Sequence, residues 1–528
     1  MCDEFSLNIE NVNSISDLQK KVRELRIISY NNRSKSAVLD LVKEGITTAE
    51  KFEDVFSLVN LLSLRITHLQ HQKENLQLIT EINNQIRSLS LKENYVDGLL
   101  LFYAHRWFIE KMKGNKVLAS KSIEKCMDLI TKSGTNDKFI YNVCSYLYAI
   151  ELWVEKRNLQ SVVILERNFG FFLDNQMYHG LISALGVLII IYQYSQSKRK
   201  SMKLIKQIYS KNLLYDIPTE IRSIFYYFMG VGYKLNLNFV EARNYFEKSL
   251  SILKLNFESS IYSSYYLRCL AHITSCYALQ GELELSYNKM NEVENQIEER
   301  IISRNLDPFS RNQIEHDFNL TKFYILSRLH NVQLNDLGDL IKEIIKKIET
   351  QHGDAMFFSE FLLNANLSRK QLIKIKKLNT PSTKRVEHIL DFLIAKKNYN
   401  KEYQILELVS TLQRRPAEER MTLEERAFAD LLAAQEYFKL KRYTEIYPLL
   451  RKYEKRLDQI EVLELRLFME AFIQIGAYKN GDLMGPVNQY LAIKKCRLYR
   501  FTKLENRLLD YLDIQAKEAR ANTNYIYS

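Results

Sequence analysis

The fold of this chain is decided by residues 224–250, which read IFYYFMGVGYKLNLNFVEARNYFEKSL. The stretch predicts two short antiparallel helices, because large apolar residues recur at helical spacing around the small residues Gly230 and Ala242. We expect those two small residues to lie at a tight contact between the helices. One hairpin of this kind cannot bury its own apolar face, so it needs neighbours stacked on both sides. The stretch therefore predicts an α-helical solenoid.

Composition supports an all-α chain. Its 528 residues include only 15 Gly and 6 Pro, and a turn-rich β architecture would need many more of both. Hydrophobic residues make up 46% of the chain, which is enough for a large core. No segment shows sustained alternation of apolar and polar residues between turn signals, so we predict no strands.

The hairpin pattern recurs along the chain. A second copy covers residues 270–293, a third covers 430–453, and a degenerate copy covers 103–126. The spacing of Gly230, Tyr233, Ala242 and Phe246 resembles the tetratricopeptide repeat, although the later copies depart from it at several positions. That resemblance implies a right-handed α-solenoid of antiparallel helix pairs. It is specific for an architecture and nearly silent on activity.

The domain organisation follows from breaks in this pattern. We predict a disordered tail over residues 1–14, one helical array over 15–378 and a second array over 384–528. The boundary is placed at NTPST, residues 379–383, which interrupts a run of basic helices. Near the N-terminus, Gly45 is predicted to end a helix, and Thr47 with Glu50 is predicted to form the capping box of the next one.

The resemblance also implies a binding surface, because the first helices of such hairpins line a concave groove. The residues at those positions are mostly aromatic, apolar or basic, which suits a protein or peptide partner with acidic and apolar side chains. A Lys and Asn clamp for a terminal carboxylate, found in some members of the family, is absent. The predicted groove residues are Tyr227, Val231, Lys234, Arg268, Ala271, Ser275, Phe428, Leu431 and Gln435.

A net charge of +12 leaves a second kind of partner open. The charges are dispersed, with 75 Lys and Arg against 63 Asp and Glu, so nucleic-acid binding is an alternative rather than the leading hypothesis. The basic cluster nearest the C-terminus has Tyr499 and Phe501 interleaved with it, and aromatic rings between cations can stack on bases. Its cations, which form a predicted anion or nucleic-acid face, are Lys494, Lys495, Arg497, Arg500 and Lys503.

Neither an enzyme nor a metalloprotein is predicted. The chain carries no Walker loop, no nucleotide-binding glycine motif and no zinc-protease motif, so we expect no catalytic residue and no cofactor. None of the six Cys forms a C-x-x-C pair, and Cys269 and Cys276 are predicted to be core residues. His68 and His71 are predicted to be exposed residues on a helix. The polar N-terminus favours a cytoplasmic location.

These features lead to one functional hypothesis and two alternatives. The leading hypothesis is a non-enzymatic scaffold that binds a protein or peptide along the groove of a helical array. The first alternative is a peptide-sensing signalling or transcription-regulatory receptor. The second is a nucleic-acid-associated protein that uses the basic helix faces. The oligomeric state does not follow from the sequence.

Overall fold

A computed structural model of the chain describes most of its residues. The described residues are 9, 12–32, 36–71, 76–135, 137–155, 157–195, 198–210, 217–235, 238–254, 260–302, 308–329, 332–347, 355–378, 386–397, 407, 409, 412, 423–460, 462–482, 491, 494–496, 498–499 and 501–511. Over these ranges the chain forms helices and turns and no strand, which confirms the all-α prediction. None of the helices in these ranges is both long and apolar enough to cross a membrane.

The chain divides into two compact units. Unit 1 comprises Met1–Ile191 and Leu204–Ile221, and unit 2 comprises Tyr192–Lys203 and Arg222–Ser528. The helix α10 (Lys198–Ser210) contributes residues to both units. The predicted boundary at 379–383 lies outside the described residues and stays a prediction.

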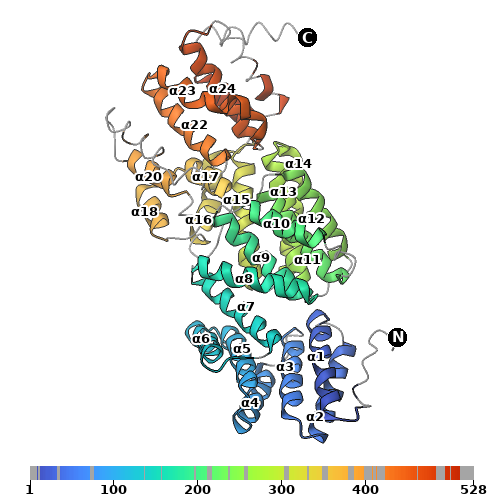
Figure 1. Cartoon of the computed structure of the whole chain (residues 1–528). Coiled ribbons are helices and arrows are strands. Elements are labelled where there is room, and N and C mark those ends of the chain that lie inside the picture. Colours follow the sequence, from blue (N-terminus) through green and yellow to red (C-terminus); the bar gives the residue numbers. More distant parts are fainter. Residues whose placement is uncertain are drawn as a thin grey trace. The chain divides into compact units, whose positions relative to one another are not determined.

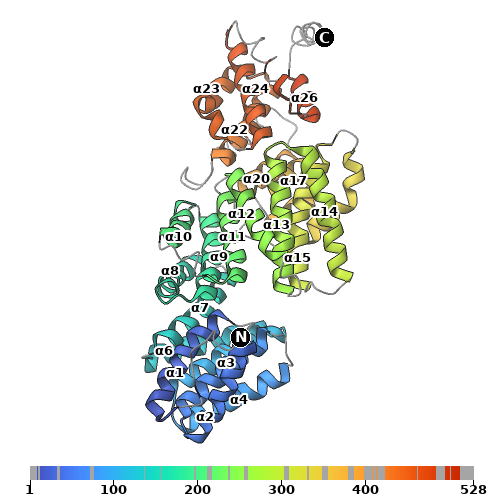
Figure 2. The same ribbon diagram turned by 90° about the vertical axis from the view of Figure 1, so that its right-hand side faces the viewer.

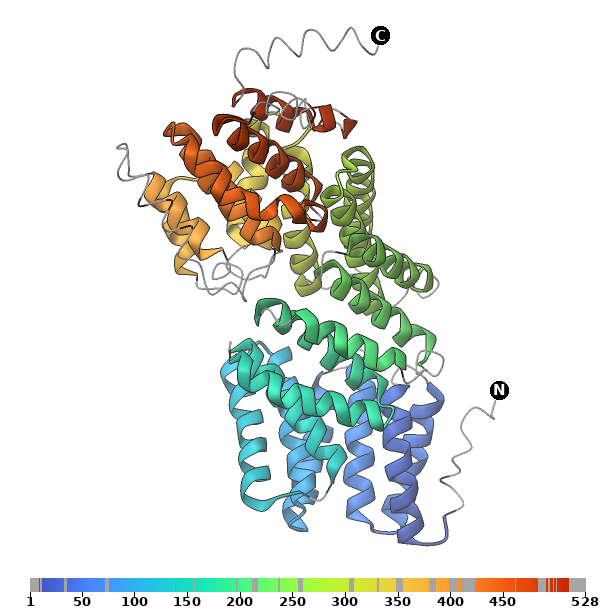
Figure 3. The same cartoon turned by 45° about the horizontal axis from the view of Figure 1, so that its top comes forward.

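Unit 1 is built from helices that pack in consecutive pairs (Figure 1). In addition, α1 contacts α3, α3 contacts α5 and α5 contacts α7, so these four helices lie side by side among the blue and teal helices of Figure 3. Stacking of this kind buries the apolar face that a single pair would leave in water. The helices are α1 (Ile15–Asn31), α2 (Ser36–Lys51), α3 (Val55–His71), α4 (Leu76–Lys92), α5 (Val96–Met112), α6 (Lys116–Ser133), α7 (Lys138–Val154), α8 (Asn158–Asp174) and α9 (Tyr178–Ser195).

Unit 2 repeats the scheme around one apolar core that runs from Tyr227 to Leu508. Figure 2 shows its second helix pair, α13 and α14, beside α15. Its elements are α11 (Thr219–Leu235), α12 (Phe239–Leu253), α13 (Ser260–Leu279), α14 (Leu283–Ile302), α15 (Pro308–Leu326), η1 (Leu334–Leu337), α16 (Gly338–Lys347), α17 (Ala355–Asn364), α18 (Arg369–Lys377), α20 (Glu387–Lys396), α22 (Leu423–Lys439), η3 (Tyr443–Glu445), α23 (Ile446–Leu450), η4 (Arg451–Gln459), α24 (Leu463–Lys479) and α26 (Thr502–Leu509).

The four hairpins predicted from the sequence are present as the pairs α5–α6, α11–α12, α13–α14 and α22–α23. The predicted tight contact in the second of these is confirmed for Gly230, because a Cβ atom added there would lie 2.6 Å from the Phe246 ring. Ala242, on the partner helix, is fully buried. In the last pair the second helix is short, since η4 continues the chain in place of a longer α-helix.

The turns that close three of these pairs share one hydrogen bond. In each turn the backbone N–H of one residue donates to the carbonyl five residues earlier. The residue just before this donor has a positive φ angle and is Gly114, Gly281 or Lys441. This bond satisfies a carbonyl that the end of the helix leaves without a partner. It runs from Asn115 to Glu110 (2.8 Å), from Glu282 to Tyr277 (3.0 Å) and from Arg442 to Tyr437 (2.9 Å).

Two local predictions in unit 1 are wrong. Gly45 does not end a helix but lies inside α2, where an added Cβ atom would approach the Leu61 side chain to 3.0 Å. Thr47 and Glu50 likewise lie within α2 and cap nothing. The glycine therefore allows α2 and α3 to pack closely instead of terminating α2. Of the predicted N-terminal tail, Ile9 and Val12 are buried in an apolar core, while residues 1–8, 10 and 11 lie outside the described ranges.

The prediction for His68 is also wrong. This histidine is fully buried, and its Nε2 atom lies 2.9 Å from the Ser29 hydroxyl. Cys269 and Cys276 are buried free thiols, as predicted. Among the described residues, no three His, Cys, Asp or Glu side chains form a group suited to a metal ion.

Candidate functional site

Three of the predicted groove residues meet at a histidine that the sequence analysis missed. The Tyr227 hydroxyl lies 3.3 Å from His272 Nε2, and Lys234 Nζ lies 3.4 Å from His272 Nδ1. Arg268, one helical turn before His272 on α13, lies beside the Tyr227 hydroxyl. We call Tyr227, Lys234, Arg268 and His272 the His272 cluster.

Lysine chemistry fixes the hydrogen-bond directions in this cluster. An ammonium group can only donate, so Nδ1 of His272 accepts from Lys234. The ring proton of the neutral imidazole then resides on Nε2 and is donated to the Tyr227 oxygen. Both contacts are long, so the cluster is held mainly by packing.

Aromatic rings surround the cluster. The Phe246 ring stacks on His272 with centroids 5.0 Å apart, and the Tyr265 ring meets Tyr227 edge-on at 5.0 Å. Lys234 Nζ lies 5.7 Å from the centre of the Phe357 ring on α17, which gives the ammonium a cation–π contact. These contacts join α11, α12, α13 and α17 around one set of polar groups.

The electrostatic environment of the cluster is positive. Burial is the largest cause that lowers the pKa of His272 well below its usual value, and the charges of Lys234 and Arg268 lower it further. His272 is therefore neutral at physiological pH, between two cations. A negatively charged ligand group would be stabilised here, because buried charges are little screened by solvent.

The cluster has an accessible edge. Tyr227 and Lys234 are buried, with 5% and 6% of their surfaces exposed, whereas Val231 and Arg268 are only half-buried. The half-buried Phe228 and Tyr265 border them. A ligand at this edge would meet apolar rings and the Arg268 side chain, with the Lys234 ammonium beneath.

The remaining five predicted groove residues are buried as well. Ala271 and Ser275 are buried on α13, and the Ser275 hydroxyl donates to the carbonyl of His272 in its own helix. On α22, Phe428 and Leu431 belong to the apolar core of unit 2, and Gln435 is buried as well. Like Tyr227 and Lys234, these five side chains expose at most 8% of their surfaces.

The predicted basic face is only partly described, because Arg497 and Arg500 lie outside the described residues. Lys494 and Lys495 are exposed, and Lys495 pairs with Glu470. The Lys503 side chain is half-buried, and its ammonium donates to two backbone carbonyls of the same chain. Phe501 is buried, while Tyr499 is exposed.

No known protein-family model and no curated protein sequence matches the chain. Three solved structures show a weak overall similarity. The apo form of RapI has 11% identity, covers 70% of this chain and 98% of its own, and gives a TM-score of 0.45. A Rap protein complexed with competence and sporulation factor has 12% identity, coverages of 76% and 98%, and a TM-score of 0.42.

The third structure is the apo form of the quorum sensor NprR from B. thuringiensis. It has 12% identity, covers 69% of this chain and 99% of its own, and gives a TM-score of 0.42. TM-scores this low support no conclusion about what the present chain binds.

Proposed function

We propose that this chain is a non-enzymatic scaffold of tetratricopeptide-like helix pairs that binds an acidic, partly apolar peptide at the His272 cluster. The observation that carries the proposal is the convergence of two cations, Lys234 and Arg268, on a neutral histidine among aromatic rings. Arginine and aromatic side chains dominate the energetics of many interfaces. A carboxylate of the ligand would pair with Arg268, and its apolar side chains would pack on Phe228 and Tyr265.

The nucleic-acid alternative has less support. Of the described cations on the predicted basic face, Lys495 is paired with a carboxylate and Lys503 donates to carbonyls of its own chain. Both interactions compete with phosphate binding. A peptide-sensing receptor, in contrast, would use the same cluster and would add a change in helix packing when the peptide binds.

Selection from a library of displayed random peptides tests the proposal. The full-length chain should enrich peptides rich in Asp or Glu together with Leu or Phe, and their binding should weaken as salt is raised. Arg268→Gln should lose this acidic preference. The matched control is Arg369→Gln, which removes an exposed guanidinium on α18 and should enrich the same peptides as the unmodified chain. Two outcomes would contradict the proposal: enrichment of basic peptides by the unmodified chain, or enrichment of the same acidic peptides by Arg268→Gln and the unmodified chain.

A further inference from the structure

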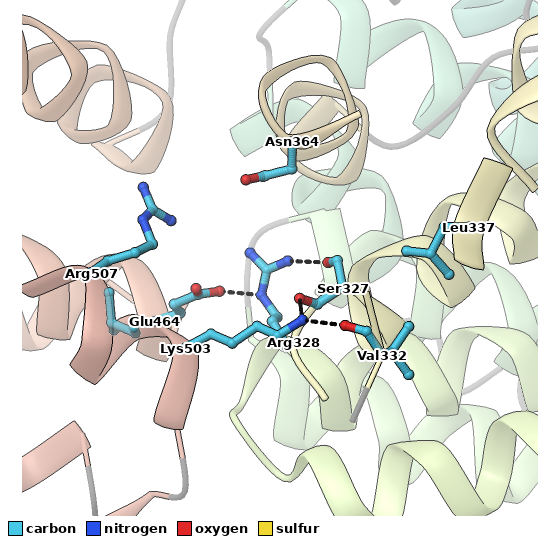
Figure 4. Close-up of a pocket in the computed structure, with 9 residues that line it drawn as sticks. Ser327, Arg328, Val332, Leu337, Asn364, Glu464, Lys503 and Arg507 are labelled. Atoms are coloured by element: carbon cyan, nitrogen blue, oxygen red, sulfur yellow. Dashed lines mark hydrogen bonds and ion pairs between the residues drawn. The ribbon is translucent and has the colours of Figure 1, made fainter. Parts of the chain in front are cut away.

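A second site lies elsewhere in unit 2, where the end of α15 meets α24 and α26. A cavity of about 200 Å³ opens there, lined by polar and charged side chains and by the apolar residues Val332, Leu337 and Leu504. Figure 4 shows Val332 and Leu337 across the cavity from Lys503 and Arg507. We call it the Arg507 pocket. Its polar side chains include Asn364, Glu464, Lys503 and Arg507.

Two ion pairs of the buried Arg328 lie at the wall of this pocket. The Arg328 guanidinium donates to Glu464, and to Glu360 at 2.7 Å, and it lies 3.5 Å from the centre of the Tyr324 ring. The Tyr324 hydroxyl donates to Oε2 of Glu464 at 3.1 Å. Arg328 is therefore committed to its own chain, and these bonds fix the Glu464 carboxylate at the pocket wall.

Two cations in the pocket keep donor capacity. Lys503 Nζ donates to the carbonyls of Ser327 (2.8 Å) and Val332 (2.9 Å), and an ammonium has a third hydrogen to give. The Arg507 guanidinium lies over the Phe468 ring at 4.8 Å and makes no hydrogen bond or ion pair with the described part of the chain. Figure 4 shows both side chains reaching the cavity from α26.

Two acceptors complete the lining. Asn364 Nδ2 uses its two hydrogens on the carbonyl and the carboxylate of Glu360, at 2.8 and 3.0 Å. Its Oδ1 atom therefore remains as an acceptor at the pocket. The described bonds to Glu464 both end on Oε2, which leaves Oε1 as a second acceptor.

We propose that the Arg507 pocket binds a free L-α-amino acid with an aliphatic side chain. Its carboxylate pairs with Arg507 and the remaining Lys503 donor. Its ammonium group donates to Asn364 Oδ1 and Glu464 Oε1, and its side chain packs on Val332, Leu337 and Leu504. The volume of about 200 Å³ suits such a ligand, because a cavity of about 150 Å³ already holds benzene.

The charges agree with this ligand class. Arg328, Lys503 and Arg507 oppose Glu360 and Glu464, which leaves an excess of one positive charge around the pocket. Burial and the nearby Arg328 charge lower the pKa of Lys503, a sign that this ammonium lacks full solvation. A carboxylate supplies the missing stabilisation, and a cation without a carboxylate would be repelled. The inference is independent of the His272 cluster and of the proposed peptide.

Calorimetric titration of the full-length chain with L-leucine, L-valine and L-isoleucine tests the inference. N-acetyl-L-leucine keeps the carboxylate but loses the ammonium charge, and L-leucinamide does the reverse. We expect leucine to bind at least tenfold more tightly than either derivative. Failure of all three free amino acids to bind, or equal binding of a derivative, would overturn the proposal.

Variants locate the site. Arg507→Gln should weaken leucine binding at least tenfold, and Arg369→Gln, the matched loss of an exposed guanidinium, should leave it unchanged. Val332→Phe places a ring in the cavity and should abolish binding without removing any polar group. Circular dichroism checks that each variant is folded. Undiminished leucine binding by folded Arg507→Gln and Val332→Phe would place the site elsewhere and refute the assignment.

Discussion

At the scale of single residues, small side chains decide how closely the helices approach. A Cβ atom at Gly230 in α11 would lie 2.6 Å from the Phe246 ring, which is too close, and one at Gly180 in α9 would make a tight contact of 3.0 Å with the Phe172 ring. By contrast, a Cβ atom at Gly170 in α8 would meet nothing within 4 Å. Packing therefore requires glycine at Gly230, whereas nothing near Gly170 requires it.

Replacing two of these glycines should have opposite effects on stability. Gly230→Ala places a methyl group against a buried ring and should lower the free energy of unfolding by about 1–3 kcal/mol. Gly170→Ala should raise it by about 0.5–1 kcal/mol, since alanine is the better helix former. Urea denaturation followed by circular dichroism measures both. An equal change in the two variants would mean that the α11–α12 contact is looser than described.

One histidine, His105, should make unit 1 sensitive to acid. Burial lowers the pKa of His105 to about 4, from a usual value near 6.5. The unfolded chain therefore binds more protons than the folded chain between these values, so stability should fall as the pH drops from about 6.5 towards 4. His105→Gln can keep the hydrogen bond to Ser63 and should show a smaller loss between pH 7 and pH 5. If the unmodified chain and His105→Gln lost the same stability between pH 7 and pH 5, titratable groups other than His105 would cause the loss.

At the scale of elements, one turn recurs with different residues at its strained position. Gly481, which follows α24, has a φ angle of 97°, and the N–H of Asp482 after it donates to the Ala477 carbonyl at 3.1 Å. Lys441 occupies the same place after α22, with a φ angle of 57°. A residue with a Cβ atom is disfavoured in this conformation, whereas glycine is not.

Exchanging residue types at this position should move stability in both directions. Lys441→Gly should raise the free energy of unfolding by up to about 1 kcal/mol, because it removes backbone strain. Gly481→Ala should lower it by about 1–2 kcal/mol through conformation alone, since nothing lies within 4 Å of its Cβ position. Thermal unfolding of both variants and of the unmodified chain measures these changes in stability. A stabilised Gly481→Ala variant would contradict the shared turn.

The sequence predicted the helix pairs better than it predicted their contacts. The hairpin around Gly230 has a strong apolar period, so its two helices and their close approach could be predicted. Gly45 was misassigned because a glycine that ends a helix and one that admits a neighbouring helix look alike in a single sequence. His272 was missed because repeat spacing selected Arg268, Ala271 and Ser275. Its role depends on Lys234, which lies one helix pair away.

At the scale of the whole molecule, the chain divides into two compact units. The apolar core that contains Ile9 and Leu61 belongs to unit 1, and the core from Tyr227 to Leu508 belongs to unit 2. Both tryptophans of the chain, Trp107 and Trp153, lie in unit 1. Tryptophan fluorescence therefore reports on unit 1, and far-ultraviolet circular dichroism reports on all helices.

Denaturation followed by the two signals should not give one shared transition. We expect the circular dichroism curve to contain a component, from unit 2, that the fluorescence curve lacks, because two compact units need not unfold together. Before urea is added, the circular dichroism spectrum should be dominated by the helical signal. Superimposable curves over the whole urea range would show a single cooperative core and would argue against the division into two units.

We expect the His272 cluster to bind an acidic peptide. Tyr227 is buried, so truncation to alanine would leave a cavity costing about 3–5 kcal/mol, whereas Tyr227→Phe removes only the hydroxyl. The direct test is fluorescence anisotropy with a labelled peptide that was selected on the unmodified chain. Its binding is measured to the unmodified chain, to the double variant that combines Tyr227→Phe with Arg268→Gln, and to the control variant Arg369→Gln. The account predicts at least tenfold weaker binding for the folded double variant and no change for the control. Undiminished binding by the double variant would contradict it.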